Sequence, residues 1–255
     1  MNYLSNMPPP QVGSFSLKRE NNERHSIGYA FVEGDVESLT ELTLLLSTQE
    51  QQQLESFEYP RRKNSYCLGR VSAKLAMQQI LTKADLNTIT VDNGVFGFPV
   101  VKGVQEKIQV SISHSDGLGV ALAHFEEHPV GIDIERIDPD KTSVIETCLS
   151  NDEITLIKKK LMEPYGNFVF WTIKEALSKI LKTGLMLDFK YMQIGNLEKV
   201  KEGVWISHFS SFSQYRAISF TTQHYVGSVV LPAKSTFELP DLFALANAFN
   251  RFVKR

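Results

Sequence analysis

The stretch FVFWTIKEALSKILKTGL, residues 168–185, has the spacing of an amphipathic helix and decides how the second half of the chain is organised. One sector of this helix is apolar and is expected to face the core. The opposite arc carries Trp171, Lys174, Glu175 and Lys179. An i,i+4 pair such as Glu175 and Lys179 stabilises an isolated helix by only about 0.2–0.5 kcal/mol. Taken alone, this arc is either a solvated charged face or part of a site that uses a carboxylate and cations.

An acidic pair lies upstream in PVGIDIERI, residues 129–137, which alternates as a β-strand does. The two-residue period places Asp133 and Glu135 on one face beside Gly131, about 6.6 Å apart along the strand. Like charges this close repel each other unless a cation lies between them, and Mg²⁺ suits carboxylate and phosphate oxygens. The structural alternative is an edge strand with a hydrated acidic face.

The predicted helix and strand offer complementary groups. Glu175 can complete a shell of three carboxylates around a cation held by Asp133 and Glu135. Lys174 and Lys179 can then neutralise phosphate oxygens on the same ligand. The two segments therefore predict a magnesium-assisted site for a phosphorylated ligand, provided that the strand faces the helix.

A polar turn ends the apolar strand predicted in VSISHSDGLG, residues 110–119. Ser113, His114 and the backbone N–H groups of the turn are suited to cradle a phosphate. A Ser-His-Asp triad is a poor interpretation, because adjacent residues of a strand point to opposite faces. The structural alternative is an ordinary hydrogen-bonded turn.

The composition is that of a globular protein without a strong charge bias. The chain has 255 residues, of which 42% are hydrophobic and 22% charged, and its formal net charge is −2. This charge gives no basis for nucleic-acid binding. No run approaches the roughly 20 apolar residues of a membrane helix, and the two distant cysteines fit a reducing compartment better than a disulfide framework. We expect a cytoplasmic monomer without nucleic-acid or membrane partners.

The same order of elements occurs twice along the chain. Each half runs from a strand through helices to a meander of short strands. The predicted regions are a flexible tail (1–26), a first half (27–127), a second half with the metal site (128–231) and an extension with one helix (232–255). The predicted fold class is α+β, a pseudo-dimer of two similar halves, each a small antiparallel sheet packed with helices. A ligand is expected in a cleft between such halves.

Four motifs in this order resemble the 4′-phosphopantetheinyl transferases of the large, surfactin-synthetase-activating type. They are GRVSAK (69–74), ISHS (112–115), GIDIE (131–135) and WTIKEALSK (171–179). The resemblance covers about residues 27–231 and implies the pseudo-dimeric fold. It also implies transfer of the phosphopantetheine arm of coenzyme A to a serine of an apo acyl or peptidyl carrier protein, with release of 3′,5′-ADP.

The resemblance implies roles for individual residues. Mg²⁺ at the coenzyme A pyrophosphate would have three carboxylate ligands, Asp133, Glu135 and Glu175. Glu175 would also be the general base for the serine hydroxyl, directly or through water, and Lys179 would hold the pyrophosphate. Ser113 and His114 would contact the nucleotide, where the histidine of the family meets the 3′-phosphate.

Two positions depart from the family's pattern, and both lack a cation expected near the nucleotide. Members often carry arginine just before the aromatic residue of the first-half helix, where this chain has Ser65. Many also have Gly-Lys-Pro in the strand turn, where Phe98 replaces the lysine. Arg62 and Arg70 are the candidates to compensate, since arginine binds phosphate readily.

Three functions remain open on the sequence. The first is a magnesium-dependent phosphopantetheinyl transferase, which the acidic residues favour. The second is a non-catalytic module that binds coenzyme A or a carrier protein, which the missing cations favour. The third is another magnesium-dependent enzyme acting on a nucleotide.

Overall fold

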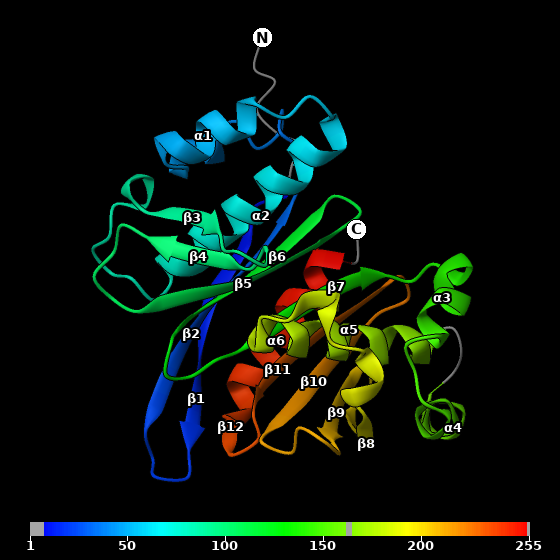
Figure 1. The fold of residues 1–255 in the computed structure, drawn as a ribbon. Helices are drawn as coiled ribbons and strands as arrows, with labels where there is room; N and C mark the ends of the chain where they lie inside the picture. Colours follow the sequence, from blue (N-terminus) through cyan, green and yellow to red (C-terminus); the bar gives the residue numbers. More distant parts are fainter. Residues whose placement is uncertain (1–7, 162–164, 254–255) are drawn as a thin grey trace. The chain divides into compact units, whose positions relative to one another are not determined.

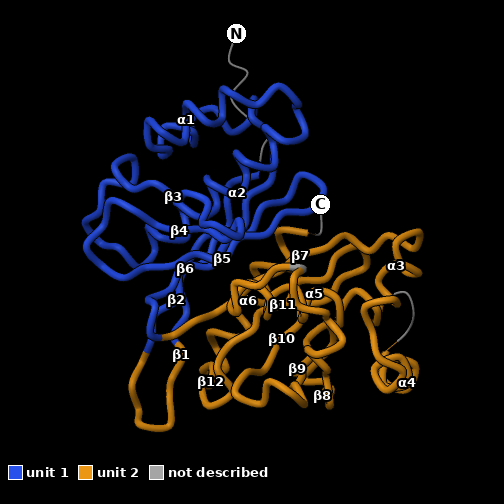
Figure 2. The backbone as a smooth tube through the Cα atoms, in the orientation of Figure 1, with its two compact units in different colours: residues 1–16, 25–127 blue, residues 17–24, 128–255 orange. Residues whose placement is uncertain are grey.

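A computed structural model describes residues 8–161 and 165–253, and Figure 1 shows the order of their elements. The described chain divides into two compact units, coloured separately in Figure 2. Unit 1 contains residues 8–16 and 25–127, and unit 2 contains residues 17–24 and 128–253. Helices accompany antiparallel strand pairs in each unit, so the predicted α+β class is confirmed.

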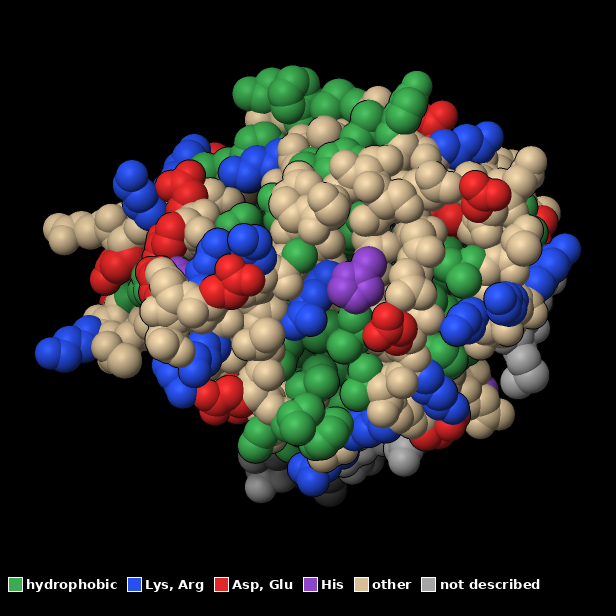
Figure 3. Space-filling view, turned by 90° about the horizontal axis from the view of Figure 1, so that it is seen from below, with side chains coloured by type: hydrophobic (Ala, Val, Ile, Leu, Met, Phe, Trp, Pro, Cys, Tyr) green, Lys and Arg blue, Asp and Glu red, His purple; other side chains and the backbone are tan. Residues whose placement is uncertain are grey.

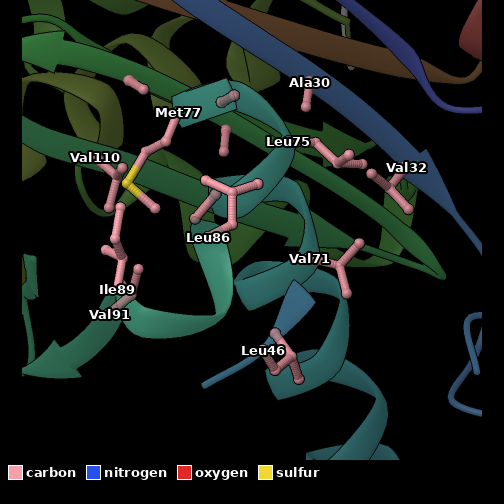
Figure 4. Close-up of a cluster of buried hydrophobic side chains, with 14 of the residues drawn as sticks. Ala30, Val32, Leu46, Val71, Leu75, Met77, Leu86, Ile89, Val91 and Val110 are labelled. Carbon is pink, nitrogen blue, oxygen red and sulfur yellow. The ribbon is translucent and has the colours of Figure 1, made fainter. Parts of the chain in front are cut away.

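Unit 1 packs one long helix, α2, on a sheet in which β1, β2, β6 and β5 are neighbours in that order. Between α2 and β5 in the sequence, β3 and β4 form a separate two-stranded sheet. Figure 4 shows part of the core, where α2 side chains such as Val71 and Met77 meet side chains of the strands. The elements are β1 (Gln11–Arg19), β2 (Arg24–Glu33), α1 (Thr48–Glu55), α2 (Pro60–Gln78), β3 (Thr90–Asn93), β4 (Pro99–Lys102), β5 (Ile108–Ser115) and β6 (Leu118–Phe125). The tip between β1 and β2, residues 17–24, belongs to unit 2.

Unit 2 has a five-stranded sheet in the order β7-β11-β10-β9-β8, with α5 on one face. On the opposite face, the ring of Phe249 in α6 lies 5.8 Å from that of Phe220. The C-terminal helix therefore packs on its own unit. The elements are β7 (Gly131–Arg136), α3 (Thr142–Glu146), α4 (Asn151–Lys160), α5 (Tyr165–Leu181), β8 (Ile194–Lys201), β9 (Val204–Phe209), β10 (Tyr215–Thr221), β11 (Tyr225–Pro232), β12 (Ser235–Phe237) and α6 (Leu239–Val253).

The structure corrects the predicted tail of residues 1–26. Residues from 11 onward form β1 and the start of β2, and residues 1–7 lie outside the described part of the chain. Phe15 and Leu17 of β1 are buried on alternate positions, and Leu17 pairs with Phe237 of β12. Polar residues and prolines around Phe15 and Leu17 concealed this alternation, and one of the two neighbouring strands, β12, is more than 200 residues away in the sequence.

Both units bring their long helix into direct contact with a strand at a glycine. A Cβ added at Gly28 of β2 would lie 2.1 Å from the carbonyl oxygen of Ala76 in α2. A Cβ added at Gly131 of β7 would lie 2.1 Å from the carbonyl oxygen of Ala176 in α5. In both units, a strand glycine approaches the carbonyl oxygen of a helix alanine at the same distance. Gly28 of β2 therefore corresponds to Gly131 of β7, and Ala76 of α2 corresponds to Ala176 of α5.

Gly131→Ala is expected to lower the free energy of unfolding by about 1–3 kcal/mol, because the added methyl group meets helix backbone that cannot move aside alone. Urea denaturation measures this change. Gly28→Ala is the matched variant in unit 1 and is expected to cost a similar amount. At Gly69 of α2, where an added Cβ would come no closer than 3.2 Å, to a side-chain methyl group of Ile112, alanine controls for glycine replacement without a clash with backbone. Wild-type stability of Gly131→Ala would contradict the close contact.

Candidate active site

The contact at Gly131 sets the face of β7 that the helix covers. Because side chains of a strand alternate, Asp133 and Glu135 share the face of Gly131 and point toward the α5 side of the sheet. Lys179 of α5 reaches this face, and its Nζ donates 2.8 Å hydrogen bonds to Asp133 Oδ1 and to the carbonyl of Ile132. The strand thus faces the helix, as the predicted site requires.

Glu175 lies one helical turn before Lys179 and is partly buried. Its pKa is raised to about 7, first by burial and then by the negative charge of Asp133. Lys179 opposes this increase, and Glu135 adds to it. The side chains of β7 and α5 therefore act on one another electrostatically, and Glu175 can exchange a proton near neutral pH.

The raised pKa of Glu175 predicts how stability depends on pH. The folded protein binds this proton more tightly than the unfolded chain does, since the pKa is about 7 against an ordinary 4.5. As the pH rises from about 4.5 through about 7, the unfolded chain loses this proton before the folded protein does, so the free energy of unfolding falls. In metal-free buffer, Glu175→Gln should remove that decline, so its stability relative to wild type should increase from about pH 5 to about pH 8. Urea unfolding at both pH values measures the change, and a parallel pH dependence would contradict it.

The acidic residues fit a cation by their chemistry. Asp133, Glu135 and Glu175 offer the hard oxygen donors that Mg²⁺ prefers. After burial, repulsion from Asp133 and Glu135 contributes to the raised pKa of Glu175, and a cation would relieve this repulsion. Within the described ranges, however, no group of three or more His, Cys, Asp or Glu side chains is spaced to hold a metal ion. Binding would therefore require Lys179 or the carboxylates to shift.

Lys174 does not join this cluster. It is fully buried, and its Nζ donates to Glu153 Oε2 at 2.7 Å, Phe189 O at 3.0 Å and Cys148 O at 3.1 Å. Burial lowers the pKa of Lys174, and Glu153 opposes this effect. An ammonium group has three donors, so these acceptors use them all. The expected role of Lys174 in phosphate binding is corrected, because α4 and the segment around Phe189 cover its side of the helix.

Ser113 and His114 occupy the end of β5 in unit 1. Ser113 is buried, whereas His114 is exposed. This difference agrees with the opposite directions expected for neighbouring residues of a strand. The predicted nucleotide contacts therefore belong to unit 1, while the acidic residues belong to unit 2.

The two arginine candidates also lie in unit 1, on α2. Arg70 is buried, with Nη2 donating to Asn93 Oδ1 at 2.9 Å and the guanidinium 4.6 Å from the centre of the Tyr66 ring. Its Nε has no hydrogen-bond partner among the described residues. Arg62 is exposed and lies over the ring of Phe57. Arg70 therefore has a buried N–H group that can donate a hydrogen bond to an anion.

The sequence pattern did not predict a cluster of buried hydroxyl groups next to the acidic strand, formed by Thr172, Ser219 and Ser228. Ser228 of β11 is opposite Asp133 in the sheet register. Its Oγ is 2.7 Å from Thr172 Oγ1 of α5 and 2.8 Å from Ser219 Oγ of β10. These contacts connect the helix to the strands next to Asp133. Small hydroxyl residues inside apolar strands were the only signal for them.

The aligned positions of unit 1 lack the acidic set. The glycine contacts align each residue of β7 with the residue 103 positions earlier and each residue of α5 with the residue 100 positions earlier. The residues aligned with Asp133, Glu135, Glu175 and Lys179 are Ala30, Val32, Leu75 and Gln79. The two units thus share a scaffold, and this cluster of carboxylates and lysine belongs to unit 2.

Two curated proteins match about half of this chain. A 4′-phosphopantetheinyl transferase gsp of Aneurinibacillus migulanus is 30% identical over 133 residues, which are 51% of this chain and 54% of that protein. The L-aminoadipate-semialdehyde dehydrogenase-phosphopantetheinyl transferase of Candida glabrata is 30% identical over 123 residues, 44% of this chain and 47% of that protein. The chain therefore spans about half the length of these relatives.

A crystal structure of a holo-(acyl-carrier-protein) synthase from Bacillus anthracis in complex with CoA (3′,5′-ADP) aligns with a TM-score of 0.35 and 20% identity. The alignment covers 43% of this chain and 96% of the synthase. The family model of the 4′-phosphopantetheinyl transferase superfamily matches residues 129–230, which include β7 and α5. The resemblance predicted from the motifs is thereby confirmed over residues 129–230, the part of the chain that matches the superfamily model.

Proposed function

We propose that the protein transfers the 4′-phosphopantetheine group of coenzyme A to a serine of an apo acyl or peptidyl carrier protein. The products are the holo carrier and 3′,5′-ADP. One observation carries the proposal: Lys179 contacts Asp133, and Glu175 responds to the charge of both, inside the segment that matches the superfamily. The names of the relatives support the same activity.

The proposed chemistry assigns the proton and the charge to residues of α5. The serine oxygen bonds to the phosphorus on the pantetheine side of the pyrophosphate, and the bond to 3′,5′-ADP breaks. Glu175 takes the serine proton, directly or through water. In the metal-free protein its pKa is raised to about 7 by burial and by Asp133, and a bound cation would lower this pKa. Lys179 neutralises negative charge on the pyrophosphate, since catalysis of phosphoryl transfer depends mainly on positioning and electrostatics.

Asp133, Glu135 and Glu175 are the proposed ligands of Mg²⁺. The ion, when bound, would supply positive charge at the pyrophosphate. Lys179 would then exchange its contact with Asp133 for one with a phosphate oxygen. This exchange suits the partly exposed position of Lys179, whose side chain is 24% exposed against 5% for Asp133.

Ser113, His114, Arg62 and Arg70 are the proposed contacts of the nucleotide. The unpaired Nε of Arg70 supports its part in this set, because a buried donor without an acceptor is unfavourable and an anion would satisfy it. His114 and Arg62 are exposed and can reach a ligand from solvent. Lys174 is left out of the set, because protein acceptors already use its three donors.

The proposed partners are coenzyme A and the carrier protein, and we infer a cytoplasmic monomer without nucleic-acid or membrane partners. No helix in the described residues is long and apolar enough to cross a membrane. The face displayed in Figure 3 has acidic and basic side chains interspersed rather than gathered by sign. Such a surface suits a protein whose net charge is −2 and gives little support for nucleic-acid binding.

Mass spectrometry of apo carrier proteins incubated with the protein, coenzyme A and Mg²⁺ tests the proposal. Carriers from fatty-acid, polyketide and peptide synthesis should be included, because the sequence does not specify one. A phosphopantetheine adduct on at least one of them is expected. If calorimetry detects coenzyme A binding but none of the carriers is modified, the non-catalytic binding module becomes the better interpretation.

A further inference from the structure

A buried ion pair lies directly beside Glu175 in the sequence and on another side of α5. Lys174 Nζ and Glu153 Oε2 are 2.7 Å apart, and both side chains are fully buried. Lys174 also donates to the carbonyls of Cys148 and Phe189. One ammonium group of α5 is therefore attached to three separate segments of unit 2.

Glu153 is bound as extensively as its partner. Its Oε2 accepts from the backbone N–H of Ser150, which completes the capping box of α4. Its Oε1 accepts from the backbone N–H of Ile194, at the start of β8. The pair thus connects α4, α5 and β8, and these hydrogen bonds oppose both rotation and sliding of α5.

Unit 1 contains the same pair at aligned positions. Lys74 of α2 and Glu50 of α1 are 2.8 Å apart and buried. Glu50 accepts from the backbone N–H of Ser47 in a capping box and from that of Val91 in β3. Lys74 also donates to two backbone carbonyls, those of Leu86 and Ile89. The pair is therefore part of the scaffold that both units share.

The two pairs differ in the residue that comes next on the helix. Residue 75, after the lysine of unit 1, is a buried leucine, whereas residue 175, after the lysine of unit 2, is the glutamate of the candidate site. A change in the position of α2 would affect core packing and the proposed nucleotide contacts Arg62 and Arg70, an effect expected in the affinity for coenzyme A. The same change in α5 would also move Glu175 and Lys179 relative to Asp133.

We propose that Lys174 and Glu153 are a positioning pair for the transfer reaction. The pair sets the rotation and axial position of α5 so that Glu175 and Lys179 point to the acidic face of β7. This inference rests on the proposed function. Misplacement of a catalytic group by about 1 Å can lower a rate by about 10²-fold, so an attachment that prevents it has a direct effect on turnover.

Paired substitutions separate positioning from stability. Removing one partner alone would leave an uncompensated buried charge, so both charges are removed together. Lys174→Met with Glu153→Gln removes the pair in unit 2, and Lys74→Met with Glu50→Gln is the matched control in unit 1. In both variants the glutamine oxygen can still accept from a backbone N–H group. Urea denaturation should show similar losses of stability for the two variants.

Steady-state kinetics with an apo carrier provide the deciding measurement. The unit 2 variant should lose about 10²-fold in kcat, while KM for the carrier stays within about threefold of wild type. The unit 1 variant, assayed at saturating coenzyme A, should keep kcat within about threefold. If the unit 2 double variant does not fold, Lys174→Arg is the substitute, because it keeps both charges of the pair while changing the geometry of the donors, and it should lower kcat in the same direction.

Equal kcat values for the two double variants would overturn the positioning role and leave the pairs as fold elements. Wild-type kcat in the unit 2 variant, or in Lys174→Arg where that substitute is needed, would overturn it as well. A wild-type protein that modifies none of the carriers would instead refute the proposed function and, with it, this inference. The two failures are distinguished by the activity of the wild-type protein.

Discussion

Glu175→Gln is expected to lower kcat for carrier modification by about 10³-fold, within the range that a general base contributes. The amide cannot accept the serine proton, yet it keeps the size of the carboxylate and loses its repulsion with Asp133. Coenzyme A binding should therefore survive. A single-turnover time course by mass spectrometry measures the rate, and calorimetry measures the affinity for coenzyme A.

The matched control for this substitution is Glu202→Gln. The Glu202 side chain is 93% exposed on the same unit, so the control makes the same chemical change away from the site. Its kcat is expected to equal that of wild type. A Glu175→Gln protein with wild-type turnover would show that another group takes the proton.

Lys179→Met is expected to lower kcat/KM by about 10²- to 10³-fold, the typical cost of removing one group that stabilises transition-state charge. The ammonium is held beside Asp133 at 2.8 Å, where it can reach a pyrophosphate bound at the acidic face. The loss should appear in the affinity for coenzyme A as well as in turnover, because Lys179 is proposed to contact the ligand before and during transfer.

Loss of stability has to be separated from loss of activity in this variant. Lys179→Met removes the ammonium that is paired with the buried Asp133 carboxylate, which should destabilise the metal-free protein. Adding Asp133→Asn should restore stability but not activity. Lys199→Met, which removes a half-exposed lysine from an ion pair in the same unit, is the control. Full activity of Lys179→Met would remove Lys179 from the site.

The acidic side of the site was predictable because it depends on local periodicity. Alternation along residues 131–135 placed Asp133 and Glu135 together, and the helical period placed Glu175 and Lys179 one turn apart. The contact between the strand and the helix was only a condition of that prediction. The close approach of Gly131 to Ala176 supplies it, and periodicity alone does not reveal which glycine allows such an approach.

Lys174 shows what a helical period cannot predict. The period separates polar from apolar sides, but a polar side need not face solvent or ligand. In this protein α4 and the segment around Phe189 cover that side, so Lys174 is buried with Glu153 and the Trp171 ring lies 5.3 Å from that of Phe189. Ser150 and Glu153 do carry the spacing of a capping box. That spacing predicts where α4 begins. It does not predict that Lys174 also donates a hydrogen bond to the Glu153 carboxylate.

The first strand was missed for a related reason. Within residues 11–19 only Phe15 and Leu17 are buried, and one of the two strands that flank them in the sheet, β12, is distant in the sequence. Long-range pairing is not visible in the segment itself. The division of the chain into two similar halves was easier to recognise, because it depends on the repeated order of elements rather than on one segment.

The most direct test is the mass of an apo carrier protein after incubation with the protein and coenzyme A, in Mg²⁺ and in EDTA. A phosphopantetheine adduct is expected with Mg²⁺ and not with EDTA, and not with a variant that combines Asp133→Asn and Glu175→Gln. Formation of the adduct at the same rate in EDTA, or by the double variant, would contradict a magnesium-dependent transferase site on β7 and α5.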